Sequence, residues 1–138
     1  MPELSAKRSR LLALGALLLS LLTELYMGWR LAVRGLVAAE GHGGAIIYQY
    51  YELAAIIVFA LSQAVAIDQV RRGSPRFFGW AVPPALFAIA VGIVTWARYG
   101  VSWLFFTHTL RGSLLLGAAM IHLRTLEAQA SESEAALP

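Results

Sequence analysis

Four long apolar stretches constrain the fold of this chain more than any other feature of its sequence. They cover residues 11–28, 45–67, 78–97 and 101–121. Each is about 20 residues long, the length of helix that crosses a hydrocarbon core of about 30 Å. Continuous leucine, alanine, valine and isoleucine do not give the alternating pattern of a membrane strand. The sequence therefore predicts an all-α, polytopic integral membrane protein with four transmembrane helices.

The composition excludes several other classes of protein. Only 14% of the residues are charged and 59% belong to the hydrophobic set, whereas about 25% are charged in an average soluble domain. The absence of cysteine excludes a disulfide scaffold, a thiolate metal site and thiol redox chemistry. The net charge of +3 comes from basic residues clustered beside apolar runs, a pattern that reports membrane topology. We expect the lipid bilayer as a partner and no nucleic acid.

Lysine and arginine gather on one side of the predicted bundle. Seven of them lie on one side, before the first helix, in the second connection or after the fourth helix: Lys7, Arg8, Arg10, Arg71, Arg72, Arg76 and Arg124. Only three lie at the helix ends on the other side. Because basic loops stay in the cytoplasm, we expect both termini to be cytoplasmic, at the inner membrane if the source is bacterial. The predicted parts are a basic tail over 1–10, an antiparallel four-helix bundle over 11–122 and a polar tail over 123–138.

Four ionisable residues interrupt the apolar helices: Glu24, Glu52, His108 and Arg111. A rise of about 1.5 Å per residue places the first three about 10 Å below the outer surface, with Arg111 one turn deeper. Charges facing lipid are costly, so such residues face the bundle interior and mark functional sites. Three helices therefore contribute polar groups to one layer in the outer half of the bilayer.

Helical spacing also places these groups on shared faces. Three sets of residues recur at intervals of three, four or seven positions, which place each set on one helix face: Ala13, Leu17, Ser20 and Glu24; Tyr48, Glu52, Phe59 and Gln63; His108, Arg111 and Leu115. Each set forms a polar stripe that can point into a bundle, while the opposite face stays apolar. We expect these stripes to meet in the interior.

Two interpretations of the polar layer are open. In one, a glutamate pairs with Arg111 and the remaining polar groups only join the helices. In the other, two carboxylates, an imidazole and a guanidinium form a site. One carboxylate is then fixed by Arg111, and the other, with a raised pKa, carries a proton. The predicted ligand-binding or proton-binding residues are Glu24, Glu52, His108 and Arg111, with Tyr48 near the outer mouth.

Cofactors are not determined by the sequence. Glu24, Glu52 and His108, with Glu40 or His42 as a lid, are candidate ligands of a divalent metal, but their spacing is not that of a ligand set and Arg111 would oppose a cation. His108 and His122 share a helix face, so a paired copy of the chain offers two haem sites. The simpler reading of His122 is an interfacial residue beside Arg124. We expect no metal and leave the cofactor open.

Several prolines and small residues are expected to shape helix packing and not to take part in a functional site. Pro83 and Pro84 remove backbone hydrogen bonds within the third helix and should bend it. Two pairs of small residues four apart allow helices to approach closely: Ala88 with Gly92, and Ser113 with Gly117. The connection between the third and fourth helices is almost absent, so these helices must be close neighbours.

The leading functional hypothesis is a small membrane transporter or ligand-binding protein, with proton coupling as one form of transport. A homodimer is expected because four short helices rarely enclose a full pathway. A second hypothesis is an accessory subunit of a larger respiratory, photosynthetic or transport complex, whose polar stripes dock onto partner subunits. A third is a membrane enzyme that acts on a lipid-soluble substrate, with Glu52 or His108 as general acid or base. The sequence does not decide whether the chain is an enzyme.

Overall fold

The computed structural model of the chain is all-helical over the residues that it describes, which confirms the predicted class. Its four helices are α1 (Pro2–Ala38), α2 (Gly43–Arg71), α3 (Phe77–Tyr99) and α4 (Trp103–Ala135). The structure describes residues 2–38 and 43–135, with side chains over 5–33, 53–98, 100–103 and 105–135.

Within the described residues, three helical stretches are long and apolar enough to cross a membrane, namely Ser5–Val33, Leu53–Arg71 and Phe77–Arg98. Large apolar side chains cover their outer faces, such as Leu22, which is 64% exposed. The helices extend beyond the apolar runs. α1 begins at Pro2, so residues expected as a basic tail are helical, and α4 carries the acidic C-terminal segment as far as Ala135.

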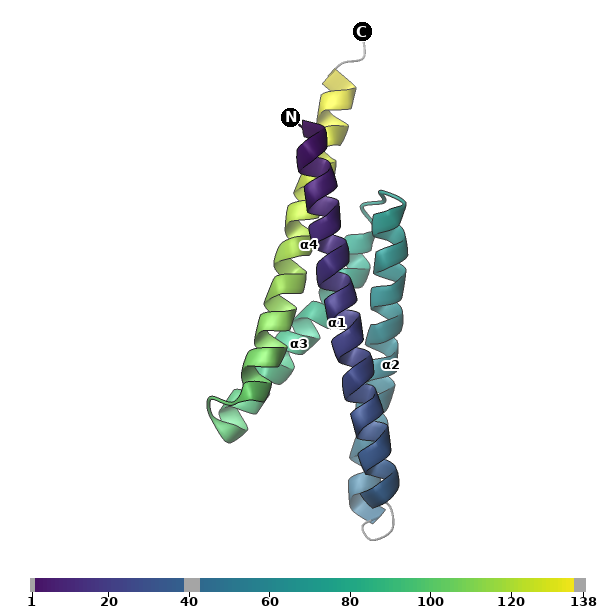
Figure 1. Cartoon of the computed structure of the whole chain (residues 1–138), viewed down its shortest axis with the longest axis vertical. Helices are drawn as coiled ribbons and strands as arrows, with labels where there is room; N and C mark the ends of the chain where they lie inside the picture. The colour runs from purple at the N-terminus through teal and green to yellow at the C-terminus, as the bar shows by residue number, and fades with distance from the viewer. Residues whose placement is uncertain (1, 39–42, 136–138) are drawn as a thin grey trace.

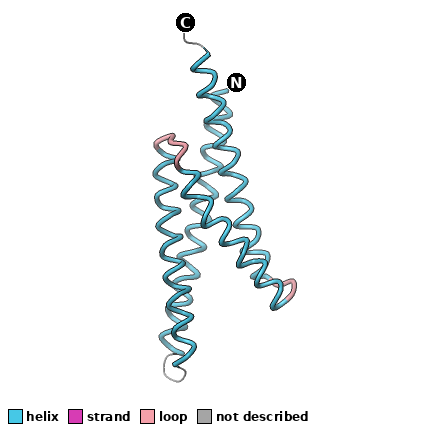
Figure 2. Tube along the Cα trace, turned by 180° about the vertical axis from the view of Figure 1, so that it is seen from behind, coloured by secondary structure: helices cyan, strands magenta, loops and turns pink. Residues whose placement is uncertain are grey.

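The helices form two hairpins, α1 with α2 and α3 with α4. Both chain ends lie at the same end of the molecule, and the hairpins cross near the middle and diverge away from the termini (Figures 1 and 2). The contact between α3 and α4 is the most extensive of any pair, as their short connection predicts. Gly100 caps the C-terminus of α3 by donating its N–H to the Trp96 carbonyl at 2.8 Å. Its φ of 71° is a backbone conformation that favours glycine.

Two glycines allow α3 and α4 to pack closely. A Cβ atom on Gly92 would lie 3.1 Å from the backbone nitrogen of Thr109, and one on Gly112 would lie 2.6 Å from the Ala85 carbonyl oxygen. The packing role predicted for Gly92 is therefore confirmed. The role predicted for Gly117 is wrong within this chain, because a Cβ there would meet nothing within 4 Å.

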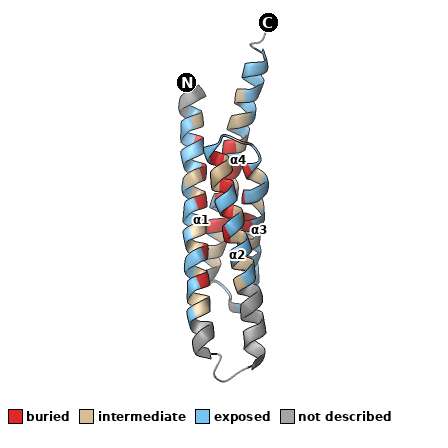
Figure 3. Cartoon of the chain, turned by 90° about the vertical axis from the view of Figure 1, so that its right-hand side faces the viewer, coloured by how far each residue is buried: buried red, intermediate tan, exposed pale blue. Residues whose placement is uncertain are grey.

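Buried residues gather in the middle of the bundle and toward the chain ends (Figure 3). All four helices contribute to one apolar cluster, consisting of Ala13, Leu17, Ala66, Val70, Phe77, Ala81, Ala85, Leu115 and Ala119. Alanine dominates this cluster, so the backbones can approach closely there. The cluster holds the helices together on one side of the polar layer.

Candidate functional site

Glu24 joins three helices through its carboxylate. Its Oε2 atom accepts a hydrogen bond from Arg111 Nη1 at 2.7 Å and another from Gln63 Nε2 at 3.2 Å. The side chains of Arg111 and Glu24 are only 7% and 4% exposed, and Gln63 is fully buried. Burying two charges is costly unless they are paired and hydrogen-bonded. The pair therefore depends on the positions of α1, α2 and α4.

The face of α1 predicted from its spacing is buried. Its four members are each at most 3% exposed: Ala13, Leu17, Ser20 and Glu24. On α4, Arg111 and Leu115 are likewise buried, so this helix turns its predicted face inward. The interval of three or four residues places Glu24 and Arg111 on the inward faces of their helices, and the contact between α1 and α4 brings them together.

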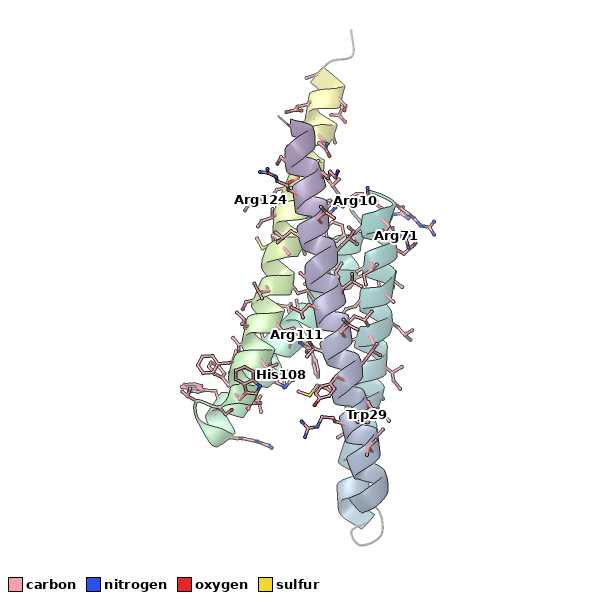
Figure 4. All side chains as sticks on the ribbon, in the orientation of Figure 1. Arg10, Trp29, Arg71, His108, Arg111 and Arg124 are labelled. Carbon is pink, nitrogen blue, oxygen red and sulfur yellow. The ribbon has the colours of Figure 1, made fainter. Side chains whose placement is uncertain are left out.

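A cavity of about 310 Å³ adjoins the ion pair. Glu24, His108 and Arg111 line it, together with five apolar residues drawn from α1, α2 and α3: Met27, Leu31, Ile56, Phe87 and Val91. His108 lies one turn of α4 farther from the termini than Arg111 (Figure 4). The cavity is thus apolar with one polar wall, and all four helices contribute to it.

Two nitrogen atoms of the residues in the polar wall have no hydrogen-bond partner among the described residues. They are His108 Nδ1 and Arg111 Nε, and both are buried. Buried polar atoms are normally hydrogen-bonded, and leaving one unpaired costs about 1–3 kcal/mol. Two residues that line the cavity thus each carry a buried nitrogen whose hydrogen bond is unsatisfied among the described residues.

Other predicted site residues lie outside the described part of the chain. The helical backbone of α2 includes Tyr48 and Glu52, but their side chains are not among those described. Glu40 and His42 belong to the connection at 39–42, which is also outside it. Their roles remain predictions. Over the residues that the structure does describe, no group of three or more His, Asp or Glu is placed to hold a metal ion.

His122 is buried within the bundle, a packing position that the sequence did not predict. It is 2% exposed, its Nδ1 atom lies 3.1 Å from Ser9 Oγ, and its ring centroid lies 5.1 Å from that of Phe77. His122 is buried because α1 begins at Pro2 and covers α4 at this level. The available signal was Ser9 itself, four residues before Ala13 on the same face.

The environment of His122 predicts a pH-dependent stability. Burial, and secondly the positive charge of Arg10, lower the pKa of His122 below its usual value. The unfolded chain therefore binds this proton more readily, and stability decreases as the pH falls below about 6.5. We expect tryptophan fluorescence to report an unfolding midpoint about 3 °C lower near pH 5.5 than near pH 7.5. His122→Gln should show a smaller pH-dependent difference, and an equal difference would contradict the assignment.

An apolar layer separates the two polar clusters. Along α1, Ser9 and Glu24 are about 22 Å apart at about 1.5 Å per residue, and Ala13 and Leu17 between them are each 1% exposed. On α4, Leu115 is equally buried between Arg111 and His122. Arg10, Arg71 and Arg124 lie at the His122 end of the molecule (Figure 4). The described residues therefore provide no continuous polar path from the cavity to that end.

A scan against protein-family models, a search of curated proteins and a search of solved structures each found no match to this chain, so the cavity and its ion pair are interpreted from their chemistry.

Proposed function

We propose that this chain is a small integral membrane protein that binds a ligand in the cavity beside Glu24 and Arg111, for transport or for retention. The observation that carries the proposal is that a buried ion pair forms one wall of an otherwise apolar cavity of about 310 Å³. Ligand sites are typically apolar hollows of about 300–1,000 Å³ with a few placed polar groups. The cavity has both the size and the lining of such a site.

Interhelical pairing alone accounts less well for this arrangement. A pair that only joined helices would be enclosed by side chains on every side, whereas Arg111 also faces open space. Among the described residues, its Nε atom and His108 Nδ1 have no hydrogen-bond partner. A ligand or water that reached them after a small movement of the side chains would complete their hydrogen bonds.

The topology that we propose is an antiparallel bundle of four spans with cytoplasmic termini. α4 begins at Trp103, within the stretch predicted to span the membrane over 101–121, and His108 and Arg111 on the face toward the cavity reduce the mean hydropathy of that stretch. Arg10, Arg71 and Arg124 gather at one end of the molecule (Figure 4), which supports a cytoplasmic location for that end. The cavity then lies in the outer half of the bilayer.

Transport by this fold would require alternating conformations rather than an open channel. The apolar layer between the cavity and Ser9 blocks a polar route in the described conformation. Movement of the α1–α2 hairpin against the α3–α4 hairpin is the simplest change that would open it. Arg111 fixes the Glu24 carboxylate in its ionised form. In proton-coupled transport, Glu52 and His108 would therefore be the residues that exchange protons.

Filling the cavity tests ligand binding. Val91 lines the cavity, whereas Ile93 on the same helix is exposed on the outer face. We expect native mass spectrometry of protein from its own host membranes to show a bound small molecule in the wild type. That mass should be absent in Val91→Trp and retained in the matched control Ile93→Trp. The spectra also count chains, and we expect two.

Two outcomes would contradict this proposal. One is a wild-type chain that carries no added mass, and the other is an added mass that survives in Val91→Trp. Recovery of larger partner subunits in place of a small molecule would support the accessory-subunit hypothesis instead.

A further inference from the structure

Two hollows adjoin each other on the surface between α1 and α4. The α1–α4 groove has a volume of about 480 Å³, and its lining includes Leu12, Gly15, Leu19, Ser113, Gly117 and Ile121. The polar hollow has a volume of about 450 Å³, and its lining includes Ser5, Ile121, Arg124, Gln129 and Glu132. Because Ile121 lines both, the groove continues directly into the polar hollow.

The groove offers apolar surface and open space. Apart from the Ser113 hydroxyl and Arg111, which is paired with Glu24, its lining is apolar. A Cβ atom added to Gly15 or Gly117 would meet nothing within 4 Å, so both glycines leave room that a larger side chain would fill. The groove has space for an alkyl chain, and the polar hollow determines what kind of molecule that chain belongs to.

Two arginines flank the polar hollow, one from each helix. Arg124 lines it and is exposed. Arg8 is also exposed, and intervals of three and four residues place it between Ser5 and Leu12 on one face of α1. Ser5 lines the polar hollow and Leu12 lines the groove. Arg8 therefore lies where the two hollows meet.

The two arginines lie at about the same level along the helices. The Ser9 and His122 side chains are in contact, with 3.1 Å between Oγ and Nδ1. Arg8 lies one residue from Ser9, and Arg124 lies two residues from His122, each toward its own chain end. Both chain ends are at the same end of the molecule (Figure 1). Arg8 and Arg124 are therefore displaced in the same direction, by no more than about 3 Å.

The charges of the polar hollow are complementary to a phosphate. Among the described residues, ion pairs join only Arg72 with Asp68 and Arg111 with Glu24, so Arg8 and Arg124 have no carboxylate partner there. Arginine matches the geometry of phosphate oxygens. Glu132 lies about 12 Å beyond Arg124 along α4, toward the C-terminus. Two cations and one more distant anion are neutralised by a head group with a single negative charge.

The length of the groove matches one leaflet of a bilayer. Eleven positions separate Arg8 from Leu19, and eleven separate Arg124 from Ser113, which is about 16 Å along each helix. Half of a hydrocarbon core of about 30 Å is about 15 Å. Arg124 lies with Arg10 and Arg71 at the end of the molecule that the proposed topology places in the cytoplasm (Figure 4). The leaflet at that level is the inner one.

We infer that the groove and the polar hollow together bind an anionic phospholipid of the inner leaflet. Arg8 and Arg124 hold its phosphate, and one acyl chain lies in the groove over Gly15 and Gly117. This site is separate from the cavity beside Glu24, and only the choice of leaflet rests on the proposed topology. Because the site is open to the bilayer, detergent replaces the lipid on purification, and the test is made in a bilayer.

Photolabelling of the purified full chain in phosphatidylcholine nanodiscs tests this inference. The probe is phosphatidylglycerol with a diazirine in one acyl chain, and excess unlabelled phosphatidylglycerol measures the specific fraction. We expect specific labelling of peptides that cover residues 11–19 and 113–121. Arg8→Gln and Arg124→Gln should each reduce it about fivefold, because one basic residue near the surface contributes about 1 kcal/mol to the attraction of an anionic lipid.

Two further variants test the position of the acyl chain. Gly15→Leu and Gly117→Leu should each reduce specific labelling about tenfold, because leucine fills the room that the chain occupies while both arginines stay in place. Unfolding followed by tryptophan fluorescence should show that all four variants fold, since each replaces an exposed arginine or a glycine beside open space.

Arg76→Gln and Gly79→Leu are the matched controls. Arg76 is an exposed arginine of the connection between α2 and α3, and Gly79 is a helical glycine of α3 at which a Cβ would meet nothing within 4 Å. Neither residue lines the groove or the polar hollow. Labelling should be unchanged in both controls.

Three results would overturn the inference: unchanged labelling in both arginine variants, unchanged labelling in both groove-glycine variants, or equal labelling of the same peptides by a diazirine-bearing phosphatidylcholine. An equal loss in Arg76→Gln would also overturn it, because the overall surface charge would then attract the lipid. Failure here is distinguishable from failure of the proposed function, since none of the four substituted residues lines the cavity. Val91→Trp tests the cavity separately.

Discussion

Arg111→Met is expected to destabilise the protein by about 3–5 kcal/mol, because it leaves the Glu24 carboxylate buried without its cation. The carboxylate would keep only the hydrogen bond from Gln63 at 3.2 Å. Glu24→Leu should be similarly harmful, since it leaves the guanidinium uncompensated. Unfolding in mixed micelles, followed by the fluorescence of Trp29, Trp80, Trp96 and Trp103, measures both changes.

The double variant Glu24→Leu/Arg111→Met should recover most of the lost stability. Replacing both members of a buried ion pair with apolar groups of similar size is often neutral or stabilising. Arg124→Met serves as the control on the same helix, because Arg124 is exposed, and it should change stability by less than about 0.5 kcal/mol. Single variants as stable as this control would contradict the buried pair.

Gly112→Ala is expected to destabilise the protein by about 2 kcal/mol. The new Cβ would lie 2.6 Å from the Ala85 carbonyl oxygen and 3.0 Å from the Ile89 nitrogen. Both are backbone atoms of α3, so relief requires the helices to move apart. The same unfolding assay measures the change.

The control for Gly112→Ala should change stability in the opposite direction. At an open helical position, alanine is favoured over glycine by about 0.5–1 kcal/mol. Gly79→Ala meets nothing within 4 Å and should therefore stabilise the chain slightly. If both variants were stabilising, α3 and α4 would not approach as closely as described.

The sequence was sufficient to predict the helices and the inward face of α1. Apolar length determines the helices, and the interval of three or four residues determines that Ala13, Leu17, Ser20 and Glu24 lie together. The same reasoning predicted that Arg111 pairs with a glutamate. The sequence did not show which glutamate pairs with Arg111, because Glu24 and Glu52 lie at similar depths along their helices. Gln63 and the contact between α1 and α4 bring Glu24 to Arg111.

Contacts between distant segments were not predictable from local pattern. Gly112 gave no sequence signal, because its partner is the backbone of α3 rather than a recognisable side chain. Gly117 looked equally suited to packing, yet it faces open space. The burial of His122 depends on how far α1 extends, and a charged segment at a helix end does not reveal where the helix begins.

We propose that the Glu24–Arg111 pair serves a ligand and does not only join helices. Native mass spectrometry of Glu24→Leu/Arg111→Met beside the wild type tests it most directly, because this variant is expected to fold. We expect a bound small molecule on the wild type and a folded double variant without it. A double variant that folds and carries the same mass as the wild type would contradict the claim.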